Sequence, residues 1–516
     1  MSWTRRDFLA TGALASLSLP LFTGCQKKAE PVAATSDVIQ PSLVSNKPSY
    51  FETYFGVTPE MIDKVLAKTM QRGGTFGDLF FEHTRRGQVA MFDGIVSTAN
   101  SEIKLGMGAR CVNKDQVGYA YTESLTLEDM LTAAEAASSI APAKDPVEIV
   151  SRHDTELKRY YSQLIDWNQF DVAKAVSLVR KIEAQARAKS PDIVSVTTSF
   201  DWEQRNIMIN TSDGINAEDR QPIYRLTLSI VMKRNGVTQS NGEGIGAKAE
   251  FDSITQEVID ALVDKAYAQT EILFHAVRPK AGEWPVVLEA GDSAILLHEA
   301  IGHGLEADFN RKEHSIYASK LNQRIAPDEV TIGDSGTVEN SYGAYNVDDE
   351  GNPCEDTILV ENGILRSYLH DRISANHYKL ASTGSGRRQG YNFAPIPRMR
   401  VTYMKNGSHE KGELLDGIEY GIYCSTFANG QVNIGQGDYS FYVQNGYLIE
   451  HGKITAPIKD VNLIGNGPDT LLKIDMIAND FKYSHSGGFC GKNGQFIPVS
   501  FGMPSVRVSS LTVGGV

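Results

Sequence analysis

The spacing of apolar residues changes its period several times along this 516-residue chain. Four segments carry apolar residues at helical spacing: 58–74, 126–141, 168–191 and 253–273. The second of these opens with Thr126, a suitable N-cap residue. Four further segments read as β-strands joined by turns: 78–94, 102–122, 193–214 and 224–236. The first half therefore predicts helices packed on a sheet.

The pattern becomes mostly β after Pro279. A single helix is expected near the start of this half, with Asp292 as its N-cap. Hairpin turns are expected at Asn362-Gly363, Asn445-Gly446 and His451-Gly452. We predict an α+β fold, in which a mixed α/β N-terminal domain (51–282) precedes a β-rich C-terminal domain (283–516) that carries this helix.

The first 24 residues predict an export signal. Arg5-Arg6 precedes Phe8-Leu9 and a 14-residue apolar stretch that ends at Phe22. About 20 apolar residues are needed to span a bilayer, so this stretch is too short. The order of these features is typical of the twin-arginine export route, and the alternatives are a membrane anchor or a chance arginine pair.

The segment that ends the signal, Leu21-Phe22-Thr23-Gly24-Cys25, resembles a bacterial lipoprotein cleavage box. Cys25 is therefore a candidate for lipidation, and ordinary signal cleavage is the alternative. Residues 25–50 predict a flexible tether, since they contain few apolar residues to bury. The expected location is the periplasm, with Cys25 as a candidate anchor to the membrane.

Charge and cysteine content narrow the classes of partner. The formal net charge is −13, and removal of the signal would make it −14 because Arg5, Arg6 and Asp7 would be lost. No run of basic residues is longer than two, which argues against nucleic acid as a main partner. The four remaining cysteines are too few for a disulfide scaffold: Cys111, Cys354, Cys424 and Cys490.

The expected helix contains His298, Glu299 and His303, in the pattern H-E-x-x-x-H. The zinc-protease helix spaces its histidines four apart, whereas these are five apart. Residues five apart lie about 140° apart around a regular α-helix, so both could not face one ion. Gly302 and Gly304 allow a distorted turn that would bring His303 back toward His298. The alternative is two histidines that are merely neighbours.

A catalytic zinc needs a third protein ligand and an open position for water. Cys490 is our first choice, because glycines on both sides form a turn that can approach an ion closely. Glu306 is next. The other candidates are Asp308, His314 and the three remaining cysteines.

Several blocks in one order resemble the TldD/PmbA family of metallopeptidases, on its TldD branch. The first block is LLHEAIGHGLEADFNR, and further blocks follow through the whole C-terminal half. They include DDEGNP, ILVENGILRSYLHDR, TGSGRRQGYNFAPIPRM and CGKNGQFIPVSFGMPSVRVSSLTVGG. The resemblance is weaker, but visible, over residues 60–280.

The resemblance implies a zinc peptidase with one Zn²⁺ per active subunit. It assigns the metal to His298, His303 and Cys490, and the general-base position to Glu299. It also implies dimers, formed either by two copies of the chain or with a PmbA-like paralogue that lacks the histidines. The expected function is hydrolysis of flexible or unfolded peptides, in which Glu299 takes a proton from a zinc-activated water.

Two further interpretations stay open. Arg387 and Arg388 lie in a glycine-rich loop and could bind a substrate carboxylate or carbonyl; the alternative is that they hold the loop or a subunit interface. A non-catalytic peptide-binding or assembly subunit is the rival to the peptidase. The intact His298, Glu299, His303 and Cys490 set argues against it, since binding alone needs no general base.

Overall fold

The computed structural model describes residues 48–142 and 145–515. The predicted signal peptide, Cys25 and most of the predicted tether lie outside the described residues, so these remain predictions. Among the described residues, the helices are all too short or too polar to cross a membrane.

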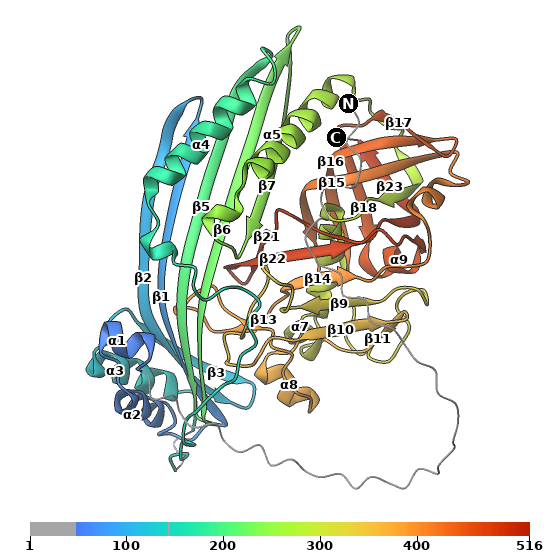
Figure 1. Ribbon diagram of the computed structural model, residues 1–516. Helices are drawn as coiled ribbons and strands as arrows, with labels where there is room; N and C mark the ends of the chain where they lie inside the picture. The colour runs from blue at the N-terminus through green and yellow to red at the C-terminus, as the bar shows by residue number, and fades with distance from the viewer. Residues whose placement is uncertain (1–47, 143–144, 516) are drawn as a thin grey trace, which may run out of the picture. The chain divides into compact units, whose positions relative to one another are not determined.

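A seven-stranded sheet lies in the first half, in the order β3-β2-β1-β5-β6-β4, and β7 also pairs with β6 (Figure 1). Its long strands are antiparallel, and positive φ angles at Asp93-Gly94 and Asn235-Gly236 form two of the tight turns. The strands are β1 (Phe76–Phe92), β2 (Ile95–Asn113), β3 (Gln116–Thr122), β4 (His153–Asp154), β5 (Ile193–Thr211), β6 (Ile215–Arg234) and β7 (Val237–Ala247). The four predicted strand segments are confirmed.

The helices of this half begin at residues whose side chains accept a backbone hydrogen bond. Thr58, Thr126, Asp171 and Thr255 are N-caps. Helices α4 and α5 pack their apolar sides on one face of the sheet, in a core that also holds Phe200 (Figure 1). The helices are α1 (Tyr50–Phe55), α2 (Pro59–Thr69), α3 (Leu127–Ser138), α4 (Val172–Arg187) and α5 (Gln256–Glu271).

The second half forms two more seven-stranded sheets around one apolar core. The first contains β8 (Gly282–Leu288), β15 (Tyr420–Val432), β16 (Asp438–Glu450), β17 (Lys453–Pro457), β18 (Val461–Asn466), β19 (Ile474–Ile477) and β23 (Val506–Gly515). The second contains β9 (Ile332–Ser335), β10 (Asp356–Glu361), β11 (Ile364–Leu365), β14 (Val401–Met404), β20 (Lys482–Tyr483), β21 (Gly488–Lys492) and β22 (Gln495–Met503). Strands β12 (Gly386–Arg387) and β13 (Ile396–Pro397) pair separately. The predicted α+β fold class is confirmed.

One predicted hairpin turn is wrong. Strand β16 runs straight through Asn445-Gly446, and the side chain of Asn445 donates a hydrogen bond to Thr426 of the neighbouring strand at 2.6 Å. Instead of a turn, the pairing of β15 with β16 shifts its register around Thr426. The turns at Asn362-Gly363 and His451-Gly452 are confirmed, since all four residues have positive φ.

The expectation of a single helix in this half is also wrong. Besides the expected segment, the structure contains α8 (Arg372–Tyr378) and α9 (Gly467–Leu472). Both have no more than two turns, too few to produce a clear helical period in the sequence. Asp371 caps α8 through its side chain, so a local signal was present.

Candidate metal centre

Strand β8 leads into a helical segment that changes type every few residues. Gly291, with φ 98°, lies between the end of β8 and the first helical turn, and four short helical segments follow it. They are the 3₁₀ turn η4 (Asp292–Ala294), α6 (Ile295–Leu297), the π-helical turn η5 (His298–Gly302) and the 3₁₀ turn η6 (His303–Leu305). Helix α7 (Ala307–Arg311) completes the segment. The expected cap at Asp292 is wrong, because its carboxylate binds Ser484 and Lys265 instead.

The π-helical turn accounts for the unusual spacing of the two histidines. A π turn closes hydrogen bonds between residues five apart, so it returns His303 to the side of His298. The prediction of a distorted helix is therefore confirmed. The glycines also allow close packing: a Cβ on Gly302 would lie 2.0 Å from Sδ of Met399, and one on Gly304 would lie 2.6 Å from the Tyr317 ring.

His298, His303 and Cys490 come together in space. The Sγ atom of Cys490 lies 3.2 Å from Nε2 of His298 and 3.3 Å from Nε2 of His303. All three side chains are buried, and their ligand atoms lie within 4.8 Å of one another. Cys490 belongs to β21, whose position is fixed by pairing with β22 and by a hydrogen bond from Arg398 to the Cys490 carbonyl. This group of side chains is able to hold a metal ion.

The protonation of these side chains fits a ligand set. Burial alone would raise the pKa of Cys490, but the facing His298 and His303 lower it well below its ordinary value. Burial alone would lower the pKa of His303, but Glu306 and Cys490 raise it well above its ordinary value. The lowered pKa of Cys490 favours the thiolate form that binds a metal, and a metal ion would compete with the proton on His303.

Glu299 lies beside this group and is more accessible than its members. Its side chain is 21% exposed, against 6% for that of His303. Its Oε2 atom lies 3.7 Å from Nε2 of His303. The carboxylate is thus next to a candidate ligand atom while still open to solvent or substrate.

Comparison with known protein families covers nearly all of the described residues. Residues 77–141 match domain 1 of the PmbA/TldA metallopeptidases, 165–274 match the central domain, and 281–515 match the C-terminal domain. This chain belongs to the PmbA/TldA metallopeptidase family.

Individual PmbA/TldA relatives agree with this assignment. A protein of Haemophilus influenzae named "Metalloprotease TldD homolog" is 34% identical over 449 residues, which cover 85% of this chain and 93% of the relative. A "Zinc metalloprotease TldD homolog" of Saccharolobus solfataricus is 29% identical, over 88% of this chain and 99% of the relative. The crystal structure of TldE from Thermococcus kodakarensis shares the fold, with a TM-score of 0.70 and 16% identity over 88% of this chain and 99% of that one.

In this PmbA/TldA chain, Glu306 contacts the far side of His303 rather than the ligand group. Its Oε2 atom lies 3.0 Å from Nδ1 of His303 and 3.1 Å from Nζ of Lys492. Despite burial, Lys492, His303 and Arg398 lower the pKa of Glu306 to about 2. The negative carboxylate can fix the ring orientation of His303, as the outer partners of metal-binding histidines do.

The remaining ligand candidates lie outside the group. Asp308 pairs with Lys492 at 2.7 Å, and His314 is exposed. Cys111, Cys354 and Cys424 are buried elsewhere, and burial raises the pKa of each thiol. Lys492 and Arg398 were not predicted from the sequence, although Lys492 stands two residues after Cys490 and so shares its side of β21.

Arg387 and Arg388 are buried and hold the glycine-rich loop against its surroundings. Arg387 donates hydrogen bonds to the carbonyls of Met399 and Pro498, the latter at 2.7 Å. Arg388 donates to the carbonyl of Asp349 at 2.8 Å and pairs with Asp78 at 3.3 Å. A contact of either side chain with substrate stays a prediction.

Proposed function

We propose that this chain is a zinc-dependent metallopeptidase that hydrolyses flexible or unfolded peptides. The observation that carries the proposal is the convergence of His298, His303 and Cys490, with Glu299 beside them. Relatives named metalloproteases, one of them a zinc metalloprotease, support the same class.

The three side chains fit zinc by their chemistry. Imidazole and thiolate are both ligands that zinc accepts, and soft sulfur disfavours Mg²⁺ or Ca²⁺. A zinc ion held by His298, His303 and Cys490 would polarise a peptide carbonyl and lower the pKa of a bound water to about 7. The low thiol pKa of Cys490 favours the deprotonated form that such a ligand requires.

The chain's own residues would then handle protons and orientation. Glu299 would accept a proton from the attacking water and pass it to the nitrogen of the leaving amine. Its side chain is partly exposed, so a substrate can approach it. Glu306, held by Lys492 and Arg398, would keep the His303 ring in place through Nδ1.

The rival function is a non-catalytic peptide-binding or assembly subunit, and one sample can separate the two. Purified protein should contain about one zinc per chain and cleave an unfolded peptide of defined sequence. A chelator should remove zinc and activity together, and Zn²⁺ should restore both, whereas Mg²⁺ alone should not. Stoichiometric zinc without any cleavage product would favour the rival.

We also propose that the protein is exported by the twin-arginine route and acts in the periplasm, with Cys25 as a candidate lipid anchor. The arginine pair and the short apolar stretch support this. Its partner would be a second copy or a PmbA-like paralogue. The sequence has no run of basic residues longer than two that would support a nucleic-acid partner.

Replacing Arg5 and Arg6 together by lysine is expected to retain the protein in the cytoplasm without loss of peptidase activity. Lysine keeps the charge but not the guanidinium pair of the motif. Cell fractionation and an activity assay on both fractions measure this. Normal delivery of the double variant to the periplasm would refute the proposed route.

A further inference from the structure

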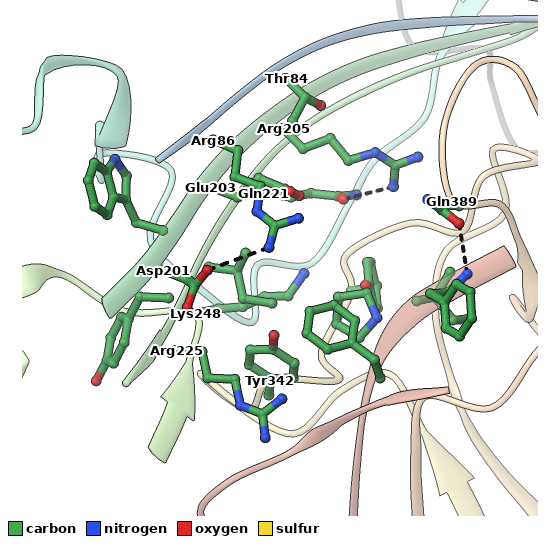
Figure 2. A pocket seen from close by; sticks show the side chains of 18 of the residues that line it. Thr84, Arg86, Asp201, Glu203, Arg205, Gln221, Arg225, Lys248, Tyr342 and Gln389 are labelled. Atoms are coloured by element: carbon green, nitrogen blue, oxygen red, sulfur yellow. Dashed lines mark hydrogen bonds and ion pairs between the residues drawn. The ribbon is translucent and has the colours of Figure 1, made fainter. Parts of the chain in front are cut away.

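A cavity of about 510 Å³ lies between the seven-stranded sheet of the first half and the β21–β22 hairpin (Figure 2). Side chains of β1, β5 and β6 line one part of it, and Phe489, Phe496 and Pro498 of the hairpin line another. Its volume is in the range of pockets that hold small molecules or single residues of a peptide. The proposed chemistry above uses none of these side chains.

The lining of the cavity carries an excess of positive charge. Seven basic and three acidic residues line it, in a protein whose formal net charge is −13. Most of the cations already have protein partners: Arg86 pairs with Asp201 at 3.5 Å and Arg205 with Asp349 at 3.2 Å. Those pairs position the wall and leave little charge for a ligand.

Three of the cations have no carboxylate partner among the described residues. Arg387 donates to the carbonyls of Met399 and Pro498, which leaves Lys248 and Arg225 for a ligand. Lys248 is 1% exposed, and its Nζ atom lies 3.7 Å from the centre of the Tyr345 ring. Arg225 is partly buried, lies over Phe489 at 5.9 Å, and its Nε–H has no acceptor. A buried cation without an anion is costly, and burial lowers the pKa of Lys248 to about 7. An anion in the cavity would stabilise its charged form.

The same cavity offers neutral donors and aromatic walls. Figure 2 shows Lys248, Arg225 and Tyr342 along one side of the cavity and Arg86, Glu203 and Gln221 along the other. Tyr342, which is 3% exposed, places a hydroxyl-bearing ring in the lining. Trp202, Tyr224 and Phe496 add apolar surface. Cationic and hydroxyl donors within apolar walls suit a carboxylate attached to an organic chain better than a free ion.

The cavity reaches the strand that carries a candidate metal ligand. Phe489 lines the cavity, and the next residue of β21 is Cys490. Neighbouring residues of a strand lie about 3.3 Å apart and point to opposite sides. The cavity and the metal centre therefore lie on opposite faces of β21, and a peptide that occupied both would pass around the edge of β21 that no described strand pairs with.

We propose that this cavity is a subsite that binds a carboxylate of the peptide substrate, through Lys248 and Arg225. The peptide nature of the ligand rests on the proposed function. The carboxylate is either the C-terminal group of the peptide or the side chain of an acidic residue, and both present the same chemistry to the site.

Peptide binding tests this subsite separately from catalysis. Three N-terminally labelled peptides of one sequence are compared on zinc-loaded Glu299→Gln protein by fluorescence anisotropy. One has a free C-terminus, one a C-terminal amide, and one a C-terminal amide with a single glutamate. We expect the first or the third to bind about 10–100-fold more tightly than the second, as hydrogen bonds to charged groups allow. If the first peptide binds more tightly, the subsite binds the C-terminal carboxylate; if the third does, it binds an acidic side chain.

Lys248→Met and Arg225→Gln should each reduce this preference to less than about threefold. Met matches the length of lysine, and the partly exposed Arg225 gives a second test should the buried substitution impair folding. Lys189→Met is the matched control, since Lys189 follows α4 and pairs with Asp264 of α5 outside the cavity, and it should keep the preference.

Equal affinity for all three peptides overturns the proposal, as does an unchanged preference in both cavity variants. A preference retained in a wild-type protein that cleaves nothing would support the subsite and refute the peptidase. The negative net charge of the protein would by itself weaken the binding of the more acidic peptides. Tighter binding of those peptides therefore cannot come from the overall charge.

Discussion

Glu299→Gln is expected to keep stoichiometric zinc and to lower peptide hydrolysis by about 10²–10⁴-fold, the usual contribution of a general base. Glutamine has nearly the same shape as glutamate, so the π-helical turn should persist. What it loses is the capacity to accept a proton. Since Glu299 is not one of the three converging side chains, the metal should not depend on its charge.

Zinc content and kcat/KM, measured on the same preparation, decide the role of Glu299. Glu329→Gln is the matched control, because Glu329 is an exposed glutamate outside the centre and its loss should leave both values unchanged. If zinc falls in step with activity, Glu299 is a ligand and the general base must be another group.

The helices and strands of the first half were predictable because their signals are local. Thr58 and Thr126 cap their helices through their own side chains. The turn at Asn362-Gly363 formed because both residues adopt positive φ. Asn445-Gly446 has the same composition, yet Asn445 has a neighbour, Thr426, that accepts a hydrogen bond from its side chain within a continuous strand. Tertiary pairing therefore overrode the turn signal.

The three candidate ligands could be predicted from the sequence, but the residues that hold them in place could not. The five-residue spacing and the flanking glycines pointed to a distorted helix, and the π-helical turn is that distortion. Glu306 was considered only as a ligand, because the sequence does not show which nitrogen of His303 it faces. The cavity beside Lys248 depends on contacts between residues far apart in the chain, so no local pattern indicated it.

Cys490→Ala is expected to abolish stoichiometric zinc and peptide hydrolysis while the fold largely persists. His298 and His303 are 192 and 187 residues away in the chain, so an effect on the metal requires the spatial group. Two imidazoles would remain, without the thiolate that supplies the negative charge. Strand β21 is held by backbone pairing with β22, which alanine preserves.

The other three cysteines supply matched controls for this prediction. Alanine at Cys111, Cys354 or Cys424 removes a buried thiol of similar size, but none of these lies in the ligand group. Each single variant should therefore keep about one zinc per chain. Metal analysis of the four purified variants, with circular dichroism to verify folding, completes the test. Full zinc in Cys490→Ala would rule out this ligand set.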